Sequence, residues 1–221
     1  MARGLFITGT DTNVGKTYVA ARIARQLRES GVKVGVYKPA ASGCRRVDGE
    51  LISDDALQLW EAAGRPSSLA DVCPQTFEAP LAPHLAAREE GRELNQERMR
   101  DGFRFWLSRC DVLLVEGAGG YLSPLGEREY VADLAIDCGL PLVIVAANVL
   151  GTINQTLQTV YVARHYGGGL PIAGIVVNDV KPDANDPSRS TNAAEIACRA
   201  AVPFVTTLAN QEQDFSPAVD W

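Results

Sequence analysis

The sequence predicts an α/β fold, in which helices cover both faces of a mostly parallel central sheet. The first observation is that short apolar segments typical of strands alternate with longer helical segments along the chain. The second is that the segment TDTNVGKT, residues 10–17, lies between the first strand and the first helix. The third is the length: 221 residues suffice for one sizeable α/β domain and are few for two, so we expect residues 1–221 to form a single domain.

The individual elements are predicted from apolar periodicity and from the turn residues between them. Strands are expected at residues 5–8, 34–38, 112–117, 142–146, 172–178 and 204–208, and helices at roughly 16–30, 54–63, 83–90, 96–109, 152–165 and 190–200. Five apolar side chains of the first helix share one face, and Gly31 follows its last turn, where glycine is common. Residues 44–46, 78–83 and 181–190 are expected to be loops.

Composition and charge exclude several classes of protein. The net charge of -6 and the pI near 5.0 argue against binding to nucleic acid or to an anionic membrane, since both need clustered Lys and Arg. The longest apolar run, residues 140–150, is too short to span a bilayer, and the N-terminus lacks the layout of a secretory signal. Five cysteines without metal-binding spacing indicate reduced thiols in a cytoplasmic protein.

The segment TDTNVGKT differs from the usual phosphate-binding loop at one position. That loop has a glycine, four variable residues and then Gly-Lys-Ser/Thr. Gly15, Lys16 and Thr17 are in place, but Thr10 occupies the first glycine position and Gly9 lies one residue too early. Between a strand and a helix, the loop N–H groups would bind a triphosphate, with Lys16 at the β- and γ-phosphates and Thr17 on Mg²⁺. The alternative is a turn whose glycine only caps the helix.

Other predicted strands end in groups that would complete a nucleotide site, because α/β sheets bind ligands at the carboxyl ends of their strands. Glu116 ends one apolar strand, and Lys38 ends another, where Pro39 keeps it extended. Asp54 and Asp55 begin a helix, where spacing alone does not separate a helix cap from a metal ligand. A capping role for Glu116 and a solvent-facing Lys38 are the alternatives. Two lysines beside one triphosphate suggest a second anion in the site.

Seven segments of the chain together resemble the dethiobiotin synthetase family of ATP-dependent ligases. They are TGTDTNVGKT (8–17), YKPAASG (37–43), SDDAL (53–57), APHLAAREEG (82–91), VEGAGG (115–120), LGTINQ (150–155) and VVNDV (176–180). They occur in the order and at the spacing of the family and cover most of the chain to about residue 180. Any one segment is a weak signal, whereas seven in order are specific.

The resemblance implies a reaction and residues that carry it. Family members convert 7,8-diaminopelargonate and CO₂ to a carbamate, phosphorylate it with ATP, and close the cyclic urea with release of ADP and phosphate. By matched position, Lys16 and Lys38 would hold the γ-phosphate and the carbamate as catalytic residues. Thr17, Asp55 and Glu116 would bind Mg²⁺. Thr12, Ser42 and Gly119 would line the diamine and carbamate site, so the hydroxyls of this loop would serve a second substrate.

The resemblance also implies the nucleotide contacts and a homodimer. The nucleotide would be bound by Asn13, Val14, Gly15, Lys16, Thr17, Tyr18 and Asn178, of which Asn178 would read adenine. Many family members carry Glu at the position of Asn13. In the dimer, the carboxylate of the diamine would bind the helix start at Gly151, Thr152, Ile153 and Asn154 of the other subunit, since free helix N–H groups attract a carboxylate.

Three other classes share parts of this pattern. A partition or iron–sulfur-carrier switch ATPase would carry an extra lysine early in the loop, where this chain has Gly9, Thr10 and Asp11, and an iron–sulfur carrier would also have a cysteine pair. A cobyrinic-acid-type amide synthase would need an additional glutamine-hydrolysing domain. A small-molecule kinase would have an arginine-rich lid segment. The dethiobiotin synthetase interpretation accounts for all seven segments.

Overall fold

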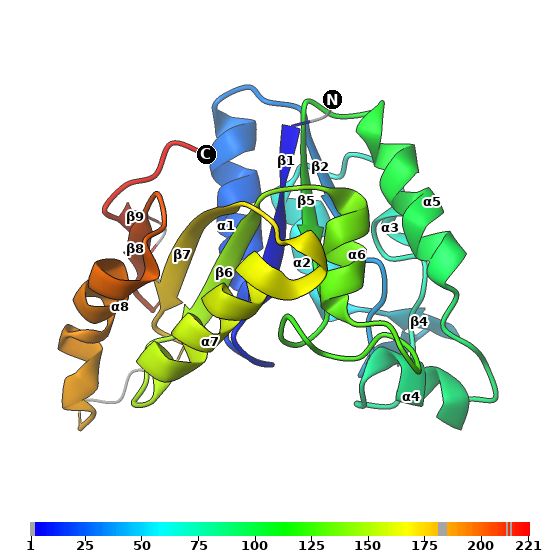
Figure 1. Ribbon diagram of the computed structural model, residues 1–221. Coiled ribbons are helices and arrows are strands. Elements are labelled where there is room, and N and C mark those ends of the chain that lie inside the picture. Colours follow the sequence, from blue (N-terminus) through cyan, green and yellow to red (C-terminus); the bar gives the residue numbers. More distant parts are fainter. Residues whose placement is uncertain (1–2, 181–184, 211, 213) are drawn as a thin grey trace.

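A seven-stranded sheet forms the centre of the protein, with the strand order β2-β5-β1-β6-β7-β8-β9 (Figure 1). The structure is a computed structural model and describes residues 3–180, 185–210, 212 and 214–221. The strands are β1 (Arg3–Gly9), β2 (Val34–Tyr37), β5 (Val112–Glu116), β6 (Leu142–Ala147), β7 (Ile172–Asn178), β8 (Val205–Leu208) and β9 (Phe215–Ser216). All neighbouring pairs are parallel except β8 and β9, so the predicted mostly parallel sheet is confirmed.

Helices cover both faces of this sheet, as the sequence predicts. In Figure 1, α6 and α7 lie in front of the sheet, whereas α1 and α2 lie behind it and pack against each other. The helices are α1 (Lys16–Glu29), α2 (Asp54–Ala62), α3 (Leu69–Val72), α4 (Pro83–Glu89), α5 (Gln96–Leu107), α6 (Val131–Cys138), α7 (Thr152–His165) and α8 (Asn192–Ala200), with short 3₁₀ turns η1 (Tyr166–Gly168) and η2 (Pro187–Ser190). Among the described residues, none of the helices combines the length and the apolar character that a membrane span requires.

Local sequence explains why the central elements form. The inner strands are buried on both faces and therefore read as near-continuous apolar runs, such as LVIVAA in β6, rather than as an alternation. Helix α1 buries the side chains of Val19, Ala20, Ile23, Ala24 and Leu27, which are the five residues that the periodicity places on one face. The six predicted strands and six predicted helices all occur, with ends that differ by one or two residues.

The sequence analysis missed several short elements. Residues 44–46, expected as a loop, run into β3 (Arg45–Val47), which pairs with β4 (Glu50–Ile52) in a hairpin whose Asp48 and Gly49 have positive φ angles of 50° and 89°. An Asp-Gly pair is a strong hairpin signal, and the flanking polar residues concealed it. The eight-residue helix α6 and the four-residue helix α3 were also missed. The expected loop 181–190 contains η2, while residues 181–184 lie outside the described part of the chain.

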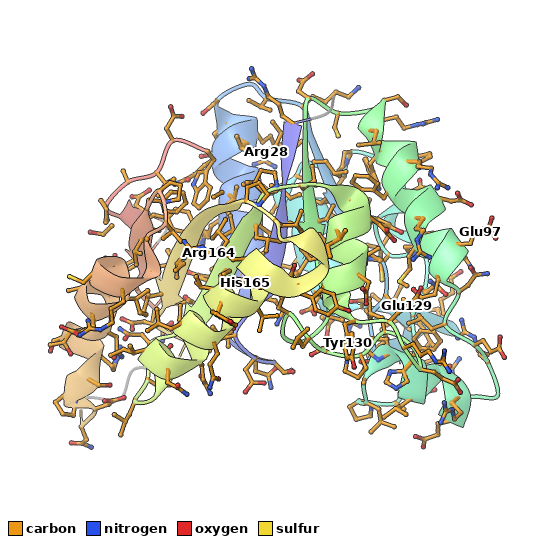
Figure 2. The ribbon with its side chains drawn as sticks, viewed as in Figure 1. Arg28, Glu97, Glu129, Tyr130, Arg164 and His165 are labelled. Carbon is orange, nitrogen blue, oxygen red and sulfur yellow. The ribbon has the colours of Figure 1, made fainter. Side chains whose placement is uncertain are left out.

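Helices α7 and α8 are joined at their carboxyl ends. Arg164 and His165 lie at the end of α7 (Figure 2), and the Arg164 guanidinium donates hydrogen bonds to the carbonyls of Ala200 and Ala201 at 2.7 and 2.6 Å. These carbonyls belong to the last turn of α8, where backbone acceptors lack partners within the helix. The two helices therefore leave the sheet side by side, and their starts lie near the carboxyl ends of the strands.

A close contact between α5 and β2 positions the residue that follows β2. Tyr37 is the last residue of β2, is fully buried, and donates a hydrogen bond from its hydroxyl to the carbonyl of Met99 at 2.8 Å. Its ring lies directly against Gly102 of α5, because a Cβ on Gly102 would lie 2.2 Å from the tyrosine oxygen. The next residue is Lys38, so this contact sets where the Lys38 side chain leaves the sheet.

We predict that Gly102→Ala destabilises the protein although it lies inside a helix. Helix propensity alone would favour alanine over glycine by about 1 kcal/mol. The buried ring of Tyr37 cannot move away without losing its hydrogen bond, so we expect a net loss of about 1–3 kcal/mol in the free energy of unfolding. Urea unfolding measures it, and Arg98→Ala at an exposed position of the same helix is the control. A gain in stability for Gly102→Ala would contradict the packing argument.

Candidate active site

The loop between β1 and α1 is folded for binding an anion. Gly15 at the start of α1 has a φ angle of 87° and Asn13 one of 61°, so the backbone turns sharply twice before the helix. The α1 start has no side-chain cap and no acidic residue in its first turn, which leaves its backbone N–H groups available. The Lys16 ammonium donates to the carbonyl of Asp11 at 3.0 Å and therefore lies along the inside of the loop.

The structure explains why this loop has Gly9 and Thr10 rather than the usual glycine. A Cβ on Gly9 would lie 2.8 Å from a methyl carbon of Val14 and 3.2 Å from the Lys16 side chain, since the loop folds back over this position. Thr10 instead continues the strand, and its N–H donates to the carbonyl of Val145 at 2.9 Å. Residue 9, rather than residue 10, is therefore the position at which a side chain would not fit.

A buried cluster of charged groups lies at the carboxyl ends of β2 and β5. The Lys38 ammonium contacts a carboxylate oxygen of Glu116 at 2.6 Å and one of Asp55 at 3.1 Å. Thr17 donates from its hydroxyl to the same Glu116 oxygen at 2.8 Å. Lys38 and Glu116 are 4% and 2% exposed, whereas the Asp55 side chain is half exposed. The second carboxylate oxygen of Glu116 is buried and has no hydrogen-bond partner among the described residues.

The two lysines have opposite electrostatic environments. Burial lowers the pKa of Lys16 from 10.5 to about 8, and the nearby Glu116 carboxylate offsets only part of this effect. Burial also disfavours charge on Lys38, but the carboxylates of Glu116 and Asp55 outweigh it and raise the pKa of Lys38 above its ordinary value. The Lys38 ammonium in turn holds the pKa of Asp55 below its usual value, against the effect of burial. Lys38 is therefore the lysine already paired with anions in this structure.

Many of the predicted site residues line one cavity of about 470 Å³. They are Thr12, Asn13, Gly15, Lys16, Thr17, Tyr18, Lys38, Ser42, Asp55, Glu116 and Gly119. The two lysines thus open into the same space, on the same side of the sheet edge. Val14, Asn178 and the start of α7 do not line this cavity.

Asn178 supports the loop through a hydrogen bond to Val14, which is a residue of the loop. Val14 is buried, and its carbonyl accepts a hydrogen bond from the amide nitrogen of Asn178 at 3.0 Å. The same amide lies so close to Gly15 that a Cβ on Gly15 would be 2.1 Å from it. Asn178 is 2% exposed at the end of β7, so in this structure its side chain is used to hold the loop.

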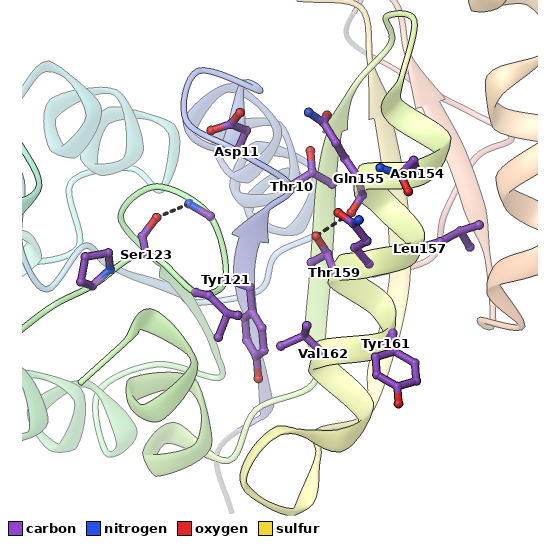
Figure 3. Close-up of a pocket in the computed structure, with 14 residues that line it drawn as sticks. Thr10, Asp11, Tyr121, Ser123, Asn154, Gln155, Leu157, Thr159, Tyr161 and Val162 are labelled. Carbon is purple, nitrogen blue, oxygen red and sulfur yellow. Dashed lines mark hydrogen bonds between the residues drawn. The ribbon is translucent and has the colours of Figure 1, made fainter. Parts of the chain in front are cut away.

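The start of α7 borders a second cavity of about 830 Å³, shown in Figure 3. Asn154 and Gln155 line it from α7, while Thr10 and Asp11 line it from the phosphate-binding loop. Gly151 begins α7 with a φ angle of 93° and no side-chain cap, and the buried hydroxyl of Thr152 has no partner among the described residues. Of the four residues predicted to bind the carboxylate, Asn154 thus lines the second cavity, and none lines the first.

Sequence reasoning missed several residues that line the first cavity. Gln58 of α2 is one of them, and it follows Asp55 by three residues, a spacing that puts both side chains on one face of a helix. Ala40, Ala41, Ala118 and Val180 also line it. The alanines flank predicted residues and carry no chemical signal, because small apolar side chains only shape the cavity.

Oxygen ligands suitable for Mg²⁺ are present, although the carboxylates do not form a ready cage. The hydroxyl of Thr17 and the carboxylates of Glu116 and Asp55 converge on the first cavity, and Mg²⁺ prefers such oxygen donors. Within the described part of the chain, there is no group of three or more His, Cys, Asp and Glu side chains that could hold a metal ion. A cation here would need further ligands, as is usual for Mg²⁺ bound with nucleotide phosphates.

We predict that Gly15→Ala weakens nucleotide binding far more than a matched change elsewhere. Gly15 and Gly49 have nearly the same φ angle, 87° and 89°, but a Cβ on Gly49 would meet no atom within 4 Å. Both variants should lose about 1–2 kcal/mol of stability from the left-handed backbone alone. Only Gly15→Ala displaces Asn178 and the loop, so its affinity for ATP should fall at least about tenfold. Equal affinities in the two variants, measured by calorimetry, would contradict this.

Comparison with solved structures supports the fold. The signal recognition particle receptor FtsY from Elizabethkingia anophelis matches with a TM-score of 0.54 and 15% identity, over 96% of this chain and 60% of its own. FtsY from Mycoplasma mycoides matches with a TM-score of 0.55 and 15% identity, over 96% and 62%. The chain thus spans less than two thirds of these proteins, and at such low identity the likeness concerns the fold alone.

Comparison of sequences shows the family. The AAA domain family model matches residues 3–213. ATP-dependent dethiobiotin synthetase BioD from Anaeromyxobacter dehalogenans is 50% identical over 88% of this chain and 84% of its own length. The proteins of the same name from Rhodopirellula baltica and Thermodesulfovibrio yellowstonii are 41% and 37% identical over 94% of this chain, and over 84% and 91% of their own lengths. By this coverage and identity, the chain belongs to the ATP-dependent dethiobiotin synthetase family.

Proposed function

We propose that this protein carries out the ATP-dependent ring closure of 7,8-diaminopelargonate with CO₂, which yields dethiobiotin, ADP and phosphate in biotin biosynthesis. The observation that carries the proposal is the pair Lys16 and Lys38 in one cavity beside a phosphate-binding loop. A switch ATPase would carry its second lysine early in the loop, whereas Lys38 follows β2, where it can hold the second anion of a ligase that brings a carbamate against a triphosphate. The relatives, which are ATP-dependent dethiobiotin synthetases, fit this reaction.

The proposed roles follow from charge and position. Lys16 is the first residue of α1, and its side chain lies along the loop. It and the backbone N–H groups of residues 13–18 would together hold the γ-phosphate. Lys38 would face the carbamate from the other side of the cavity, near Thr12, Ser42 and Gly119. Two anions repel strongly at close range in a water-poor site, and two ammonium groups would offset that repulsion. The carbamate oxygen would then attack the γ-phosphorus and release ADP, and the second amine would attack the carbamate carbon, close the ring and release phosphate.

Mg²⁺ fits the donor set of the site. Thr17, Asp55 and Glu116 would hold it, and the unpartnered oxygen of Glu116 is a free acceptor that a cation would satisfy. When bound, Mg²⁺ would supply positive charge to the transferring phosphate. Lys38 now pairs with the buried carboxylate of Glu116 and the half-exposed carboxylate of Asp55, which offsets part of their negative charge before substrates bind.

A homodimer would complete the site. The start of α7 borders the second cavity and does not line the first, and its N–H groups lack a side-chain cap, which suits a carboxylate brought by another subunit. Leu122, Val149, Leu150 and Tyr161 expose apolar surface around this helix, as expected where subunits meet.

All five cysteines are free, which agrees with a cytoplasmic protein.

The reaction is tested by supplying substrates one at a time. We expect ADP release to require ATP, Mg²⁺, bicarbonate and the diamine together, and the cyclic urea to appear in equal amount by mass spectrometry. With ¹⁸O-labelled bicarbonate, one heavy oxygen should enter the phosphate, because the carbamate oxygen attacks phosphorus; rapid quenching limits exchange of CO₂ with water. ADP release that continues without the diamine would instead indicate a simple nucleotide hydrolase.

We predict that Lys38→Gln lowers kcat roughly 10²-fold or more while changing the KM for ATP only slightly, because Lys38 would act on the carbamate and the transferring group. Lys16→Gln should lower kcat to a similar extent and also raise the KM for ATP. Lys33→Gln is the matched control, since Lys33 precedes the same strand but is exposed. Full activity of Lys38→Gln in a steady-state assay would remove Lys38 from the mechanism.

A further inference from the structure

A buried amide network holds the turn that leads into α7. The amide nitrogen of Asn192, the first residue of α8, donates to the side-chain oxygen of Asn148 at 2.9 Å and to the carbonyl of Val149 at 3.3 Å. The N–H of Leu150 donates to a carboxylate oxygen of Asp186 at 2.9 Å. Residues 149–150 are thus fixed from two sides by polar groups of the segment 186–192.

Apolar packing does not hold this turn. Leu150 is 82% exposed and Val149 42% exposed, so neither side chain anchors the backbone in the core. Gly151 has a φ angle of 93°, and a Cβ on it would meet nothing within 4 Å. Asn192, by contrast, is 1% exposed and Asn148 is 7% exposed. The position of the α7 start therefore depends on the hydrogen bonds that Asn192 donates to Asn148 and Val149, and on the one that Asp186 accepts from the N–H of Leu150.

The same network reaches the nucleotide side of the protein. The Asn148 amide nitrogen donates to Asp179 at 2.8 Å, and the Asn148 N–H donates to the carbonyl of Asn178 at 2.8 Å. Asn178 in turn supports the phosphate-binding loop through Val14. One chain of contacts thus runs from the loop, through the end of β7 and Asn148, to Asn192 and the start of α7.

We infer that Asn192 and Asp186 are positioning residues that aim the N–H groups at the start of α7 toward the carboxylate of the diamine. This inference rests on the proposed function, because that function supplies the carboxylate that would bind the helix start. The N–H of Thr152 donates to the carbonyl of Val149 at 3.1 Å, and its hydroxyl, fully buried and unpartnered among the described residues, lies at the same helix start. Free N–H groups bind an anion well only if they are held in place before it arrives.

The test compares two substrates in the full-length protein. One is diaminopelargonate, and the other is the same vicinal diamine with a methyl group in place of the carboxylate. We expect wild-type protein to prefer the first, by the ratio of kcat/KM values. Asn192→Leu and Asp186→Ala should each reduce this preference roughly tenfold, because a displaced helix start loses only its contact with the carboxylate. Their kcat/KM for the second diamine should stay near that of wild type.

Thr206→Val is the matched control. Thr206 is fully buried and donates its hydroxyl to the carbonyl of Pro217 at 2.6 Å, so the variant also loses one buried hydrogen bond but far from α7. It should lower the melting temperature without changing the substrate preference. If Asn192→Leu does not fold, Asp186→Ala at its partly exposed position decides the question.

The outcomes separate this inference from the proposed function. Equal losses of kcat/KM for both diamines would show that Asn192 and Asp186 serve stability alone and would overturn the inference. Ring closure by wild-type protein without preference for the carboxylate would also overturn it, while leaving the proposed reaction intact. A wild-type protein that closes no ring with either diamine would instead refute the proposed function.

Discussion

The buried ion pair between Lys38 and Glu116 is the interaction on which the site depends. Two opposite charges with 4% and 2% exposure lie at neighbouring strand ends, where Tyr37 of β2 pairs in register with Val115 of β5. Removing both groups from water is costly, and their attraction, with Thr17 and Asp55 as further partners, offsets that cost. Such a pair adds little to stability, so its value lies in holding charge where substrates would bind.

Strand order explains why this pair lies next to the phosphate-binding loop. Strand β1 has β5 on one side and β6 on the other, so the loop after β1 opens beside Glu116. Lys38 directly follows β2, which lies two strands from β1, and it reaches the same cavity because β5 is the only strand between β2 and β1 among the described residues. Ligand sites in open α/β sheets lie at the carboxyl edge where connections diverge to opposite sides. The sheet therefore joins segments more than twenty residues apart in sequence.

On the other side of β1, the chain builds a support for the loop rather than a wall of the cavity. Asn178 lies under Gly15, and the amides of Asn148 and Asn192 extend this support to the start of α7. Glycine at residues 9 and 15 permits the close approach on which this arrangement depends. The loop thus lies between two groups of side chains. One is the charged cluster at the ends of β2 and β5, and the other is the amide network of Asn148, Asn178 and Asn192 at the ends of β6 and β7 and the start of α8.

The sequence by itself determined the sheet, the long helices and the charged groups of the cavity, because apolar periodicity, the glycine–lysine–threonine pattern and charged residues at strand ends are local properties of the chain. The resemblance to the family supplied most of the other predicted lining residues. The sequence did not reveal the β3–β4 hairpin, whose strands are short and partly polar, or the eight-residue helix α6. Only the tertiary structure decided that Lys38 pairs with Glu116, that Asn178 lies beneath the loop, and that Gln58 joins the cavity. Those contacts join residues that no spacing rule connects, since they depend on strand order and on how closely the packed backbones approach.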